Sequence, residues 1–166
     1  MKNIHHMLGM ALISVREGVR LGTLEGVAID TTDGRVRYLY FKGADARADG
    51  AVPWDAVRAV GEDAITVDAL ESAVATVPAI DQEHLTSFVG DRPVVTESGT
   101  RLGHVTTYDL DEVTGRIERY HVSTGGFFGH LMKRELCVSR GAVRALGQDA
   151  IVVEQEAALT PEAVSE

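Results

Sequence analysis

The stretch AVRAVGEDAITV at residues 56–67 recurs in nearly the same form, AVRALGQDAIVV, at residues 142–153. When each segment is extended by one residue, nine of thirteen positions are identical, and the four differences are mild exchanges such as Val60 for Leu146. Chance does not produce such a match in a chain of 166 residues. The chain therefore contains an internal duplication, which restricts its fold to two similar units.

The duplication covers most of the chain. Residues 8–36 align with residues 89–117 at an offset of 81, and the matched positions include Gly34-Arg35 with Gly115-Arg116. The AVRA segments align at an offset of 86. The second copy therefore carries five extra residues between Val122 and Val138, within VSTGGFFGHLMKRELCV.

Glycines recur in both copies at positions typical of turns in a β-rich unit. REGVRLG and ESGTRLG each place two glycines around a short polar segment, and TTDGRV contains an Asp-Gly turn. No segment has the apolar period of a long helix, and Pro53 in PWDAV predicts a single helical turn. Each copy is predicted to be a small, closed antiparallel β-barrel of five or six strands, so the fold class is all-β. The strands expected in the first copy are residues 12–15, 24–29, 36–41, 57–60 and 64–67.

These segments resemble the PRC-barrel domain in their order. VxxxxGxxLGxV, as it stands in Val94–Val105, precedes an Asp/Gly turn and a β-rich run, and VPWDAVRAVGEDAITV closes the first copy. PRC-barrel domains are named for the cytoplasmic barrel of the photosynthetic reaction-centre H subunit, and one forms the C-terminal domain of the ribosome maturation factor. The second copy has Ser139-Arg140-Gly141 in place of Pro53-Trp54-Asp55, which leaves open a remodelled helical turn there.

The alignment predicts four segments along the chain. Two PRC-type barrels in tandem are expected at residues 1–70 and 86–156. Residues 71–85 are expected to form a linker, and residues 157–166 a flexible acidic tail.

Composition limits the partners and the compartment. A net charge of −9 argues against a nucleic-acid partner, because such proteins cluster Lys and Arg. The absence of a long apolar run argues against direct membrane insertion. Cys137 is the single cysteine and cannot form an intrachain disulfide, which favours a cytoplasmic location and a buried, inert thiol.

The sequence offers no strong motif for a metal, a cofactor or catalysis. The six histidines lack a His-x-x-x-His spacing, and turn chemistry accounts for acidic residues such as Asp30 and Asp109 without calcium. STGGFFGH lacks the Gly-Lys-Ser/Thr ending of a phosphate loop, and no serine lies in a Gly-x-Ser-x-Gly elbow. We expect a protein that is not an enzyme and needs no cofactor.

The loop unique to the second copy is the predicted partner-binding surface. Its aromatic, Met and basic side chains are the types that interface centres favour. Packing of the loop on its own barrel, and self-association into a homodimer, remain alternatives. The only tryptophan, Trp54, is either a further recognition anchor or a residue buried at the barrel end. The hypothesised contact residues in the loop, which spans residues 123–136, are Phe127, Phe128, Leu131, Met132, Lys133 and Arg134.

The resemblance to domains that bind larger assemblies implies a function as an adaptor. We expect a non-catalytic tandem PRC-barrel protein that mediates protein–protein interaction or assembly. The alternative is a regulatory protein that binds a small molecule or a metal at the junction of the two barrels, because ligand sites favour such interfaces.

Overall fold

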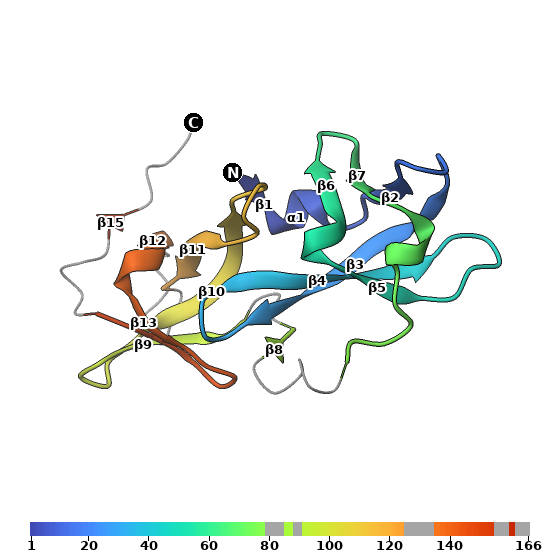
Figure 1. Cartoon of the computed structure of the whole chain (residues 1–166). Coiled ribbons are helices and arrows are strands. Elements are labelled where there is room, and N and C mark those ends of the chain that lie inside the picture. Colours follow the sequence, from blue (N-terminus) through green and yellow to red (C-terminus); the bar gives the residue numbers. More distant parts are fainter. Residues whose placement is uncertain (79–84, 88–90, 125–134, 155–159, 162–166) are drawn as a thin grey trace.

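The computed structural model describes residues 1–78, 85–87, 91–124, 135–154 and 160–161. Its regular structure consists almost wholly of strands, arranged in one sheet for each copy of the duplicated sequence. The predicted all-β class is therefore confirmed. In Figure 1 the first repeat runs from blue to green and the second from yellow to red.

The first sheet has the order β5-β4-β3-β2-β7-β6. All its neighbouring strands are antiparallel except β2 and β7, which pair in parallel with Leu12 opposite Ile65. The strands are β2 (Ala11–Ser14), β3 (Arg20–Asp30), β4 (Arg35–Gly43), β5 (Gly50–Pro53), β6 (Val57–Val60) and β7 (Ala64–Val67).

The second sheet repeats this arrangement in the order β13-β14-β9-β10-β11-β12-β15. Strands β9 and β14 again pair in parallel, with Val94 opposite Ile151. A short strand from the expected acidic tail extends this sheet beyond β12. The strands are β9 (Pro93–Thr96), β10 (Arg101–Leu110), β11 (Ile117–Ser123), β12 (Glu135–Ser139), β13 (Val143–Leu146), β14 (Ile151–Val153) and β15 (Thr160–Pro161).

The two PRC-type units expected in tandem are present, but the parallel pairs β2–β7 and β9–β14 correct the expectation of wholly antiparallel pairing. Among the described residues, no strand pairing joins the two end strands of either sheet. In the first repeat the two end strands, β5 and β6, follow each other through the 3-10 turn η1 (Trp54–Ala56). Only three residues separate these strands, so the chain bends at a corner and the strands do not lie side by side. Pro53 precedes the turn with φ −64°, as expected for a proline at a helix start.

The second repeat keeps this corner. Its 3-10 turn η3 (Arg140–Ala142) stands at the position equivalent to η1, and Ser139 has φ −74° and ψ 154°, close to the backbone of Pro53. The turn is therefore not remodelled by the loss of the Pro-Trp-Asp sequence. Its backbone hydrogen bond, from the Val143 N–H to the Arg140 carbonyl, needs no particular side chain.

Each repeat pairs with a short strand that lies just before the other repeat in the sequence. Strand β1 (Lys2–Asn3) pairs with β10 of the second repeat, and β8 (Leu85–Thr86) pairs with β3 of the first. In Figure 1, β1 and the short helix α1 (Ile4–Met7) lie at the boundary between the repeats. The remaining short helical element is the 3-10 turn η2 (Leu70–Ser72). The two repeats are thus joined by reciprocal strand pairing.

One hydrophobic core runs through both repeats. It includes Ile4 and Met7 of α1 together with buried residues from both sheets. Eight apolar positions match between the two repeated AVRA segments, and this match predicts two equivalent sets of core residues. Val57 and Val143 are half-buried and pack against the core. The other six are buried: Val60, Ile65, Val67, Leu146, Ile151 and Val153.

Asp30, at the end of β3, has a lowered pKa. Desolvation alone would raise the pKa, but the hydroxyl and backbone N–H of Thr32 and the Arg37 guanidinium stabilise the carboxylate more strongly. Because the folded-state pKa lies below the unfolded-state value, this carboxylate stabilises the fold above about pH 4. That contribution is lost as the pH falls through the folded-state pKa.

Asp30→Asn should therefore lower the free energy of unfolding by about 1 kcal/mol at neutral pH, and by less near pH 2. Denaturant unfolding at both pH values measures this difference. Glu25→Gln, an exposed neutralisation on the same strand, is the control. An equal loss at the two pH values for Asp30→Asn would contradict the assignment.

In the part of the chain that the structure describes, no helix is long and apolar enough to cross a membrane.

Candidate functional site

The junction of the two repeats is built from two equivalent hairpin turns. The β3–β4 turn meets the β10–β11 turn, and glycines take left-handed backbone conformations in both, with φ +67° at Gly34 and +73° at Gly115. The Val36 N–H donates to the Gly115 carbonyl at 2.8 Å, and the Ile117 N–H donates to the Gly34 carbonyl at 2.9 Å. Both pairs match under the offset of 81, so the contact has local twofold pseudosymmetry.

Two arginines face each other across this contact. Arg35 and Arg116 form an antiparallel bridge. The flanking hydrogen bonds make it a non-hydrogen-bonded pair, in which Cα atoms lie about 4.5 Å apart and the side chains leave the same face. The Nε atoms of both side chains are buried without a hydrogen-bond partner. Two arginine side chains thus extend from the same face of the junction.

The carboxylates nearest in sequence do not neutralise these arginines. Within the described ranges, neither guanidinium forms an ion pair. The acidic side chains of residues 30–33 and 111–118 bind other groups: Asp30 and Asp33 bind Arg37, Asp111 accepts backbone N–H groups of its turn, Glu112 binds the N-terminal amine and Glu118 binds Arg140.

Trp54 breaks the pseudosymmetry. Its side chain is only 8% exposed, and its indole N–H donates to the Val113 carbonyl of the other repeat at 3.4 Å. The ring lies against Gly115, where a Cβ atom would come within 2.7 Å of it. The equivalent residue in the second repeat, Arg140, binds Glu118. Trp54 therefore packs one repeat against the other and does not offer an exposed recognition anchor.

A polar network anchors the N-terminus to the second repeat. The Asn3 amide donates to Asp109 at 2.9 Å, and the Asp109 carboxylate contacts His121 Nε2 at 2.8 Å. The Thr107 hydroxyl donates to the Asn3 side-chain oxygen at 3.1 Å. Asp109 therefore joins the repeats through its side chain, which corrects its interpretation as a turn residue. Cys137, the register partner of His121, is half-buried and not fully buried as expected.

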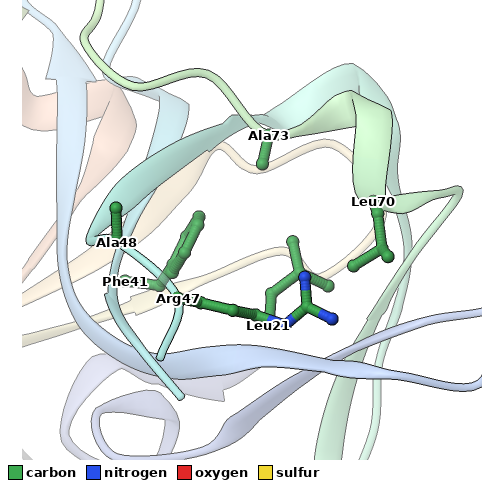
Figure 2. Close-up of a pocket in the computed structure, with 6 residues that line it drawn as sticks. All are labelled: Leu21, Phe41, Arg47, Ala48, Leu70 and Ala73. Atoms are coloured by element: carbon green, nitrogen blue, oxygen red, sulfur yellow. The ribbon is translucent and has the colours of Figure 1, made fainter. Parts of the chain in front are cut away.

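An open pocket of about 310 Å³ lies on the first repeat. Its walls are mostly apolar, and in Figure 2 the Phe41 ring and the Leu70 side chain approach it from different sides. The Arg47 side chain extends toward Leu21, so one cation borders an otherwise apolar space. The pocket can bind an apolar group with a nearby negative charge. The lining residues are Leu21, Phe41, Arg47, Ala48, Leu70 and Ala73.

Residues 125–134 of the predicted partner loop lie outside the described residues, whereas Ser123, Glu135 and Leu136 belong to the paired strands β11 and β12. The structure thus neither brings the hypothesised contact residues together nor separates them. Among residues that it does describe, no group of three or more His, Cys, Asp or Glu side chains could hold a metal ion. The loop residues concerned are Phe127, Phe128, Leu131, Met132, Lys133 and Arg134.

Sequence reasoning missed both the arginine pair and the pocket. The Gly-Arg dipeptide occurs in both copies, at residues 34–35 and 115–116. Because a charged residue is retained in both copies, this dipeptide could have identified the arginines. No comparable signal identified the pocket, because Leu21 and Phe41 look like ordinary strand residues.

Comparison with known families agrees with the two-sheet architecture. The family model described as PRC-barrel domain matches the chain twice, at residues 1–74 and at residues 81–159. No curated protein matches the chain.

Proposed function

Because this chain belongs to the PRC-barrel family, which it matches in both repeats, we propose that it is a non-catalytic tandem PRC-barrel adaptor. In this proposal the joined repeats hold a protein partner and contribute binding surfaces, without chemical conversion of a substrate. The partner inserts an apolar side chain into the first repeat.

The pocket on the first repeat is the observation that supports this proposal most directly. The buried side chains of Leu21 and Phe41 and the half-buried Leu70 line the pocket, while Arg47 is exposed at the border and can bind a carboxylate. The lining residues include no carboxylate, histidine, cysteine or hydroxyl group that could act as acid, base or nucleophile. A well-packed pocket for an anchor side chain is typical of the energetic centre of a protein interface.

The loop at residues 123–136 is proposed as the second contact, on the evidence of its composition. It is an insertion relative to the first repeat, and it combines two phenylalanines with adjacent Lys133-Arg134. Aromatic and Arg side chains are enriched at interface centres. A homodimer formed through this loop is the alternative assembly.

Filling the pocket should strongly reduce partner capture without unfolding the protein. Ala48 is exposed and lines the pocket, whereas Ala46, exposed in the same loop, is not among the lining residues. We expect tagged full-length Ala48→Trp to capture the partner about tenfold less than the unsubstituted chain from extracts of the source cells. Ala46→Trp should capture it normally. Quantitative mass spectrometry of the co-purified proteins measures the ratio.

A second variant tests the loop. Phe127→Ser/Phe128→Ser should leave the melting temperature unchanged and lose the same partner, or lose dimerisation measured by light scattering. A strongly lowered melting temperature would show instead that the phenylalanines belong to the core. If Ala48→Trp, Phe127→Ser/Phe128→Ser and Ala46→Trp all capture the same proteins in equal amounts, the adaptor proposal is wrong.

A further inference from the structure

We propose that Arg35 and Arg116 together bind a phosphate group at the pseudosymmetric junction of the two repeats. This inference goes beyond the adaptor function and does not depend on it, since it concerns a different surface. It rests on the placement of the two side chains, their unsatisfied donors and the engagement of the nearby carboxylates.

The backbone places the two arginine side chains side by side on one face of the strand pair. The reciprocal bonds between Val36 and Gly115 and between Ile117 and Gly34 fix Arg35 and Arg116 as direct cross-strand neighbours. In a non-hydrogen-bonded pair the side chains are closer than in the other type of antiparallel pair. The two side chains can therefore reach a single ligand on the same face.

The pair is unfavourable without an anion. Like charges directly opposite each other destabilise a strand pair, and a buried polar group without a partner adds a desolvation penalty. Here both penalties occur at the same place, because both Nε–H donors are buried and unsatisfied. Arg37 and Arg140, by contrast, have carboxylate partners in the structure.

A phosphate group fits this donor set better than a carboxylate. A carboxylate presents two acceptor oxygens in one plane and at most a single negative charge, whereas a phosphate group presents at least three acceptor oxygens and a larger negative charge. It can therefore accept from both arginines at once. Its negative charge also neutralises the repulsion between them. The phosphate could be inorganic or carried by a small metabolite, and the chemistry recognised is the same.

Calorimetric titration of the full chain with inorganic phosphate tests the proposal, with ionic strength held constant by chloride. We expect saturable binding and a raised melting temperature. Arg35→Gln/Arg116→Gln should bind phosphate at least about tenfold more weakly. Its melting temperature without phosphate should be equal or higher, because the repulsion is removed.

Arg20→Gln/Arg101→Gln is the matched control. These exposed arginines begin β3 and β10 at equivalent positions, and their replacement changes the net charge equally. The control should bind phosphate as the unsubstituted chain does. Arg35→Lys/Arg116→Lys, which keeps the charges but lacks the guanidinium fork, should bind with intermediate affinity.

A parallel titration with a nucleoside monophosphate distinguishes inorganic phosphate from a phosphorylated metabolite as the natural ligand. If the nucleotide binds more tightly than inorganic phosphate, the ligand is a phosphorylated metabolite. If it binds equally or more weakly, the ligand is the free ion. The proposal is overturned if neither compound binds, or if Arg35→Gln/Arg116→Gln binds both as tightly as the Arg20→Gln/Arg101→Gln control. Neither result would bear on the capture of a protein partner at the pocket.

Discussion

Gly115→Ala should reduce the free energy of unfolding by about 2–4 kcal/mol, whereas the equivalent substitution Gly34→Ala should cost about 1 kcal/mol. Both glycines have positive φ, so an alanine is strained at either position. Only at Gly115 would the new Cβ also meet a rigid ring, 2.7 Å from Cε2 of Trp54. At Gly34 the nearest atom, the Tyr120 hydroxyl, is 3.7 Å away and in ordinary contact.

Denaturant unfolding of the two variants measures the difference, and a double-mutant cycle identifies its cause. In a Trp54→Ala background, Gly115→Ala should cost about as much as Gly34→Ala, because only the backbone strain remains. If Gly115→Ala and Gly34→Ala are equally destabilising in the unsubstituted chain, Trp54 does not pack against the turn as described.

Ile65→Ala and Ile151→Ala should each destabilise the protein by about 2–4 kcal/mol. Ile65 is fully buried and Ile151 is 1% exposed, at equivalent positions on β7 and β14. Since the core is continuous from one repeat to the other, we expect each substitution to shift one common unfolding transition and not the unfolding of a single repeat.

Thermal unfolding followed by calorimetry and by Trp54 fluorescence tests both statements. Thr66→Ala and Val152→Ala, half-buried neighbours on the opposite strand faces, are the controls and should cost less. Two separate transitions, with Ile65→Ala moving only one and Ile151→Ala only the other, would show that the repeats unfold independently. Losses below about 0.5 kcal/mol for both isoleucine variants would show that these side chains do not contribute to the core.

Much of the fold follows from local patterns in the sequence. Strands β6 and β7 have the residue bounds that alternation and flanking turns predict. The pattern missed β5 at Gly50–Pro53, because glycine and proline are uncommon in strands. It also missed the parallel pairing of β2 with β7, since pairing direction depends on the curling of the whole sheet and not on either strand alone.

The junction of the two repeats was harder to predict from the sequence, because its geometry depends on contacts between the repeats. Asp109 looks like a turn residue in the sequence, yet its carboxylate binds Asn3, which lies 106 positions earlier. Trp54 is buried by the second repeat, a neighbour that no motif in the first repeat reveals. The family resemblance predicts the two units correctly, but it does not specify how they meet.

The reciprocal pairing of β1 with β10 and of β8 with β3 has a consequence for biosynthesis. A ribosome releases Lys2 and Asn3 long before it makes their pairing partners, Leu110 and Asp109. Until then the N-terminal segment and the Trp54 ring lack the surfaces that cover them. The first repeat therefore reaches its native state only after most of the second has emerged. In polysomes, where nascent chains are crowded, pairing of these strands between neighbouring chains would give intertwined dimers. Rapid emergence of the second repeat favours the single-chain product.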